Sequence, residues 1–138
     1  MANERFSSAK LAGTTSADAL QVTAPTLTVG TESSDVIAVT FASPVAAISQ
    51  FHAQLYDANM LAELVTAFTM AETGAGSEVS TTAKPGLLFK TDATGAATLS
   101  VTDVAGASGL TTRLVIHPVA DSAGSAAVAG CEATLTFD

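Results

Sequence analysis

The feature that most constrains this chain is a period of two in its apolar residues, repeated in short segments from Ala19 to Phe137. Successive side chains of a β-strand point to opposite faces, so this alternation predicts strands with one buried and one solvated face. Four sets show it most clearly and are predicted to point inward: Ile37, Val39 and Phe41; Phe51, Ala53 and Leu55; Ala97, Leu99 and Val101; Cys131, Ala133, Leu135 and Phe137. Turn signals separate the strands at intervals of about ten residues, and no strand–helix–strand alternation appears, which predicts an all-β, antiparallel sandwich.

One segment, Met60–Glu72, fits two patterns. Leu61, Leu64 and Phe68 have helical spacing, whereas the same stretch also alternates as a strand does. We favour a strand because β-branched and aromatic residues are frequent there.

Turn residues predict where the strands reverse. Asp57–Asn59 reads as a turn, and Ser77–Thr82 as a short strand between glycine-containing loops. Asp92–Gly95 is the strongest hairpin signal in the chain, because glycine supplies the positive φ that closes such a turn. Pro118 is expected to end its strand or to force it to an edge.

The N-terminal residues 1–18 lack a sustained apolar period and are predicted to form an extended arm before a sandwich domain spanning residues 19–138. We expect the arm either to stay unordered or to anchor on a neighbouring subunit, with Arg5, Phe6, Lys10 and Leu11 as its candidate partner-binding residues. These residues include no apolar core of a secretory signal, which favours a protein made and kept in a cytoplasm, or one that leaves it by another route.

Charge and composition exclude several classes of function. The chain has 138 residues, of which five are Lys or Arg and thirteen are Asp or Glu, giving a net charge of -8. The basic residues do not cluster, so nucleic acid is not an expected partner. No apolar run approaches the roughly 18 residues of a membrane-spanning helix, so no membrane association is expected. A single cysteine excludes an internal disulfide and a multi-thiolate zinc site.

Residues with catalytic or metal-binding chemistry are few. His52 and His117 lie in alternating strands beside polar neighbours and are expected to be solvated, whereas Cys131 is expected on the apolar face, away from a histidine partner. Asp57 and Asp92 each provide a single acid in a turn, which favours side-chain-to-backbone turns over calcium binding. Neither a phosphate-binding loop nor a nucleophile elbow is present. We therefore expect no enzyme activity, cofactor or metal.

The strands are rich in Thr and Ala and poor in long charged side chains. A strand surface made of Thr and Ala loses little side-chain rotamer entropy when another protein covers it. Strand propensity alone is the simpler explanation of the same composition. An arm of 18 residues adds reach, of the order of 60 Å when extended. Binding is therefore favoured over catalysis.

The segment 89–102, F-K-T-D-A-T-G-A-A-T-L-S-V-T, resembles the hairpin of bacterial immunoglobulin-like domains, in which the Asp and Gly form the turn. Together with residues 51–60, 102–118 and 134–138, it is similar to small immunoglobulin-like virion proteins of tailed bacteriophages. The resemblance covers roughly residues 35–138 and implies an immunoglobulin-like sandwich with no catalytic residues to carry over.

This resemblance implies a non-enzymatic virion protein, most simply a capsid decoration subunit that binds across the major capsid protein. Copies of itself are further expected partners, so a homo-oligomer is expected, made in the bacterial host cytoplasm and located on the capsid surface. The alternative is a tail or fibre module that binds a host glycan or receptor through exposed groups such as His52, Tyr56 and Arg113. A hydrolase depending on Cys131 is the third class.

Overall fold

The computed structural model describes residues 23–59, 68–81, 85–106, 109–119 and 128–138. The predicted arm lies outside these ranges, as does the 60–67 part of the segment that fitted two patterns. Within the described residues the secondary structure is entirely β, as predicted, and no helix there is long and apolar enough to cross a membrane.

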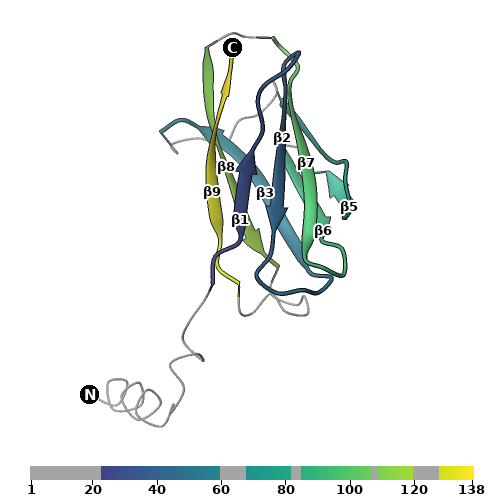
Figure 1. Ribbon diagram of the computed structural model, residues 1–138. Coiled ribbons are helices and arrows are strands. Elements are labelled where there is room, and N and C mark those ends of the chain that lie inside the picture. The colour runs from purple at the N-terminus through teal and green to yellow at the C-terminus, as the bar shows by residue number, and fades with distance from the viewer. Residues whose placement is uncertain (1–22, 60–67, 82–84, 107–108, 120–127) are drawn as a thin grey trace, which may run out of the picture.

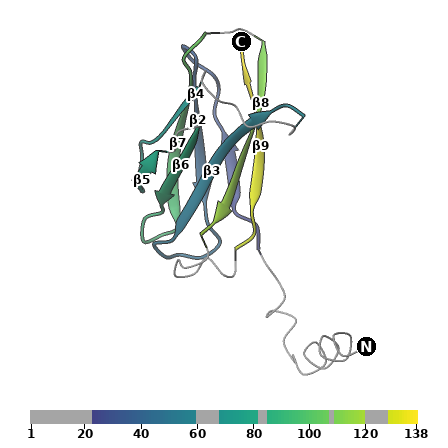
Figure 2. The same cartoon turned by 180° about the vertical axis from the view of Figure 1, so that it is seen from behind.

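Two antiparallel sheets face each other across the core (Figures 1 and 2). One sheet has four strands in the order β1-β2-β7-β4, and the other has five in the order β5-β6-β3-β8-β9. The strands in the described part of the chain are β1 (Thr26–Val29), β2 (Val36–Ala42), β3 (Gln50–Asp57), β4 (Phe68–Glu72), β5 (Ser77–Thr81), β6 (Gly86–Lys90), β7 (Ala96–Asp103), β8 (Leu110–Pro118) and β9 (Cys131–Phe137).

The core lies between the sheets and is built from the inward residues of each strand. The inward sets predicted on β2, β3 and β7 are fully or almost fully buried, as are Leu135 and Phe137 on β9. Three phenylalanines join the sheets: the Phe41 ring lies 4.6 Å from Phe51 and 5.5 Å from Phe89, measured between ring centroids. Because Phe41 belongs to the four-stranded sheet and the other two to the five-stranded sheet, this cluster holds the two layers together.

The strand order is that of an immunoglobulin-like sandwich. In that fold four strands form one sheet in the order A-B-E-D, and strands C, F and G form the other. Here β1-β2-β7-β4 takes the first order and β3-β8-β9 takes the second, while β5 and β6 extend the second sheet beside β3. The predicted fold is therefore confirmed.

The turn predicted at Asp92–Gly95 forms, but the predicted hairpin is wrong. Gly95 has φ of 84°, its N–H donates to the Asp92 carbonyl, and Asp92 Oδ1 accepts from the Ala96 N–H at 2.9 Å. The flanking strands do not pair with each other, because β6 joins β3 and β5 whereas β7 joins β2 and β4. The turn therefore connects the two sheets. Local turn chemistry determines that the chain reverses, but it does not determine which strand the following segment pairs with.

Other local predictions can be compared directly with the structure. Phe68–Glu72 is a strand, which agrees with the strand interpretation of that part of the segment, and Ser77–Thr81 is strand β5. Pro118 ends β8 opposite Phe51, and β8 is an internal strand, so the proline terminates the strand without placing it at an edge.

Gln54 departs from the alternation. The two-residue period that turns Phe51, Ala53 and Leu55 inward places Gln54 on the solvent face of β3, but Gln54 is only 5% exposed. Its side-chain amide Nε2 donates to the Pro85 carbonyl at 2.9 Å, which satisfies a donor that would otherwise be costly to bury. The chain at the start of β6 thus covers part of this face.

Glu72 fixes the crossing from β4 to β5. Its Oε1 accepts N–H groups from Gly74 at 3.0 Å, Gly76 at 3.1 Å and Thr98 at 3.0 Å. Thr98 lies in β7, so one carboxylate oxygen ties the loop that leaves the four-stranded sheet to a strand inside that sheet.

Candidate interaction surfaces

The outer face of the four-stranded sheet carries only small side chains. Alternation and strand register place these residues on it: Thr26, Thr28, Val36, Ala38, Thr40, Ala42, Thr69, Ala71, Ala96, Thr98, Ser100 and Thr102. We call this the small-residue face. No member is charged or larger than valine, so the Thr- and Ala-rich composition of the strands is concentrated on one side of the molecule.

The strand register aligns similar residues in rows across the small-residue face. Thr28, Thr40 and Thr98 lie in one row across β1, β2 and β7. Ala38, Ser100 and Ala71 form another row across β2, β7 and β4. Each row therefore consists of side chains of similar, short length.

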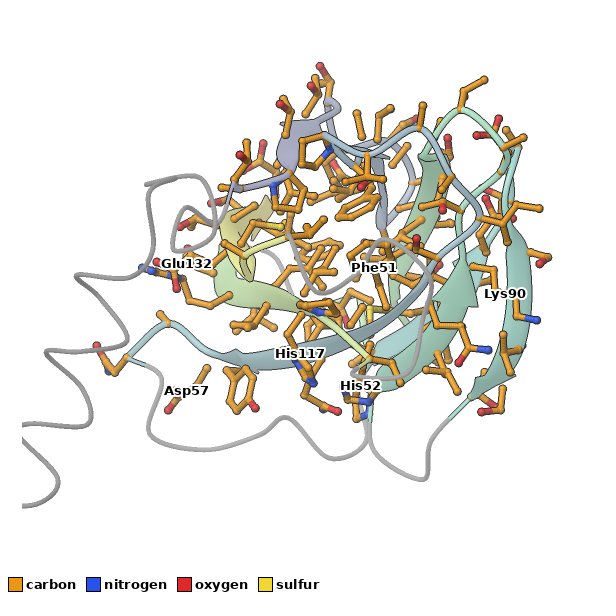
Figure 3. The ribbon with its side chains drawn as sticks, turned by 90° about the horizontal axis from the view of Figure 1, so that it is seen from below. Phe51, His52, Asp57, Lys90, His117 and Glu132 are labelled. Carbon is orange, nitrogen blue, oxygen red and sulfur yellow. The ribbon has the colours of Figure 1, made fainter. Side chains whose placement is uncertain are left out.

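The outer face of the five-stranded sheet is different in character, and we call it the polar face. It is defined by His52 and Tyr56 on β3, Lys90 on β6, Arg113 and His117 on β8, and Glu132 on β9. In Figure 3 the two histidines project away from Phe51, which lies on the core side of the same sheet. Tyr56 lies opposite Arg113 in the register, and Arg113 forms an ion pair with Glu132.

The charges of the described residues are therefore segregated. The lysine and arginine within those ranges, Lys90 and Arg113, are both on the polar face. Acidic residues are mostly at strand ends and in loops: Glu32, Asp35, Asp57, Glu72, Asp92, Asp103 and Asp138. The small-residue face is left as an uncharged surface between acidic ends.

Cys131 does not have the environment of a nucleophile. It lies opposite Ile116 in the register and packs half-buried against the core, as predicted. Burial raises the pKa of the Cys131 thiol to about 11, so the thiolate form is scarce at neutral pH. Cys131 and His117 both line a shallow hollow of about 310 Å³ along β8 and β9, together with Val115, Ile116, Gly130 and Glu132. Cys131 thus shares a hollow with a histidine, contrary to the expectation that it lies away from one.

The Asp92 carboxylate stabilises its own turn. Asp92 Oδ1 accepts from the Thr94 N–H at 2.8 Å, the Thr94 hydroxyl at 2.7 Å and the Ala96 N–H. These hydrogen bonds, the Thr94 hydroxyl first, hold the pKa of Asp92 below its usual value. Asp57 lies at the end of β3. Among the residues that the structure describes, no three His, Cys, Asp or Glu side chains gather as a metal cluster would.

The predicted partner-binding residues Arg5, Phe6, Lys10 and Leu11 lie outside the described residues, so their role stays a prediction. Sequence reasoning missed two features of the surface. It did not anticipate that the outer face of the four-stranded sheet carries no charged residue, or that His52 and His117 are direct neighbours. Both depend on strand register, which alternation alone does not supply.

Comparisons with protein-family models, with curated proteins and with solved structures found no significant match to this chain.

Proposed function

We propose that the protein is a capsid decoration subunit of a tailed bacteriophage, a non-enzymatic virion component that stabilises the head by binding across copies of the major capsid protein. The observation that carries this proposal is the small-residue face, which offers four strands of uncharged surface on one side of the sandwich. The resemblance of residues 35–138 to small immunoglobulin-like virion proteins supports the choice of partner.

The energetic argument rests on side-chain entropy. An alanine side chain loses no rotamer freedom on burial and the short threonine and serine side chains lose little, whereas lysine or glutamine loses about 1.5–2 kcal/mol. A face of Thr, Ala and Ser therefore keeps most of the free energy gained by burying its methyl groups. The threonine and serine hydroxyls retain hydrogen-bonding capacity toward a polar partner.

The small-residue face is smaller than the surface that a stable protein interface buries on each partner. With strands about 4.8 Å apart and a rise of about 3.3 Å per residue, the four strands β1, β2, β4 and β7 together cover roughly 380 Å². A standard protein interface buries about 800 Å² on each partner. We assign the difference to residues 1–18, with Arg5, Phe6, Lys10 and Leu11 as anchors on a capsid protein or on a second copy of this chain.

The position of the first described residues is compatible with a binding role for residues 1–18. The described chain starts at the end of the sandwich opposite to the C-terminus (Figure 1). Thr23 there forms a bridge with Val128, and its carbonyl accepts from the Ala129 N–H at 3.0 Å, so the first described residue is attached to the sandwich. Residues 1–18 precede this attachment by only a few positions in the sequence.

The test is to find the chain in purified virions and then to disturb the face. Mass spectrometry of mature particles should detect the chain, and Thr40→Lys with Thr98→Lys, two neighbours in the face, should reduce its occupancy on heads at least about tenfold. Thr134→Lys, an exposed threonine on the opposite sheet, is the matched control and should bind normally. Absence from virions, or equal occupancy of the two variants, would refute the proposal.

A second candidate is a tail or fibre module that binds a host glycan or receptor. The structure brings its candidate contacts His52, Tyr56 and Arg113 onto the polar face, with Tyr56 directly opposite Arg113. Tyrosine and arginine are among the residue types enriched at binding hot spots. Location at the tail, and glycan binding that is lost in Tyr56→Ala, would favour this candidate over decoration.

A further inference from the structure

His52 and His117 are the chain's two histidines, and they occupy directly opposite positions of the β3–β8 pair. Side chains at opposite positions of an antiparallel pair start from Cβ atoms about 4.5–5.5 Å apart and point to the same side of the sheet. The two imidazole rings lie 5.1 Å apart between centroids, with their planes inclined at 55°. Both project from the polar face, away from Phe51 and the core (Figure 3).

This ring separation matches that of two imidazoles sharing one metal ion. A zinc–nitrogen bond is about 2.05 Å and the ring centroid lies about 1.1 Å behind the nitrogen, so each centroid is about 3.2 Å from the metal. At a tetrahedral angle, two such centroids are about 5.2 Å apart. The distance of 5.1 Å in the protein needs little adjustment of the strands to reach that arrangement.

The net charge of the chain also favours a cation. Next to His52 in the register on the other side is Leu88 of β6, and Val115 lies two residues before His117 on the same face of β8. The whole chain has a net charge of -8, which raises the local concentration of cations. Imidazole nitrogen favours zinc, copper and nickel, whereas Mg²⁺ and Ca²⁺ favour oxygen ligands.

We propose that His52 and His117 form a two-imidazole site on the polar face for a divalent transition-metal ion, with Zn²⁺ as the representative. One ring nitrogen of each histidine binds the ion, and water fills the remaining positions, since no third His, Cys, Asp or Glu completes a cluster within the described ranges. A site with open positions is exchangeable and can accept a further ligand from a bound molecule.

The test uses the full chain and Zn²⁺ alone. Isothermal titration at pH 7.5 should show one saturable ion per chain, and the imidazole NMR signals of both histidines should shift together. His52→Gln and His117→Gln should each weaken binding at least about tenfold, because each removes one of two ligands. Uptake should fall on acidification, because protons and metal ions compete for the same imidazole nitrogens. Mg²⁺ should leave the imidazole signals unmoved.

Cys131→Ser is the matched control, because it removes the other strong zinc-binding side chain of the chain without altering the histidines. Zinc affinity should be unchanged in this variant. Unchanged thermal unfolding of the two histidine variants without metal would show that the sandwich is intact. The proposal is overturned if zinc uptake is not saturable, if the histidine variants bind zinc as the parent does, or if Cys131→Ser abolishes binding. Each outcome is independent of whether the small-residue face binds a capsid.

Discussion

Replacing Glu72 with alanine tests how the loop from β4 to β5 is held against the four-stranded sheet. The substitution removes the acceptor of three backbone N–H groups: that of Gly74 is exposed, and those of Gly76 and Thr98 are partly buried. Water can replace the carboxylate at the exposed donor, whereas each partly buried donor left unpaired costs about 1–1.5 kcal/mol. We expect Glu72→Ala to lower the free energy of unfolding by about 2–3 kcal/mol.

Thermal and urea unfolding followed by circular dichroism measure this effect. For a domain of this size, each kcal/mol corresponds to about 4 °C, so Tm should fall by about 8–12 °C. Glu72→Gln keeps one side-chain acceptor and should lose about 1 kcal/mol. Glu78→Ala removes the same charge from the exposed strand β5 and should change stability by less than about 0.5 kcal/mol. Equal losses from Glu72→Ala and Glu78→Ala would refute the reasoning, because net charge would then be the cause.

Three further predictions concern the core, a turn and the thiol. Phe41→Ala should lose about 3–5 kcal/mol because it opens a cavity between the sheets, and Phe41→Leu should lose less; equal small losses in urea unfolding would contradict the packing. Gly95→Ala should lose at least about 2 kcal/mol, since φ is 84° and the added Cβ would lie 2.5 Å from the Val45 carbonyl oxygen; a neutral effect in the same assay would contradict it. Cys131 should react with iodoacetamide at pH 8 about a hundredfold more slowly than a thiol of pKa 9.0, because its own pKa is about 11. The folded state then holds this proton more tightly than the unfolded state, so stability should fall as pH rises from about 9 to about 11; rapid alkylation of the folded chain would contradict both statements.

The fold was predictable because burial and alternation agree along most strands. On β2, Ile37, Val39 and Phe41 are buried while Ala38 and Thr40 are exposed, as a two-residue period requires. The failures come from contacts between distant segments. Asp92–Gly95 has the chemistry of a hairpin turn, yet its strands enter different sheets, and Gln54 is buried because Pro85 covers it.

For the candidate surfaces, the sequence predicts which residue types are frequent but not where they lie on the molecule. An excess of Thr and Ala indicated a face with little side-chain entropy, but only the pairing of β1, β2, β7 and β4 shows that these residues share one side. The same limit applies to His52 and His117, which are far apart in the sequence and become neighbours through the β3–β8 register.

Cryo-electron microscopy of purified phage heads tests the central claim most directly. We expect density for the sandwich on the outer surface of the shell, over junctions between capsid subunits, with the β1-β2-β7-β4 sheet turned toward the shell and the polar face toward solvent. Shells that lack this density, or that contact the sandwich through the polar face, would contradict the account.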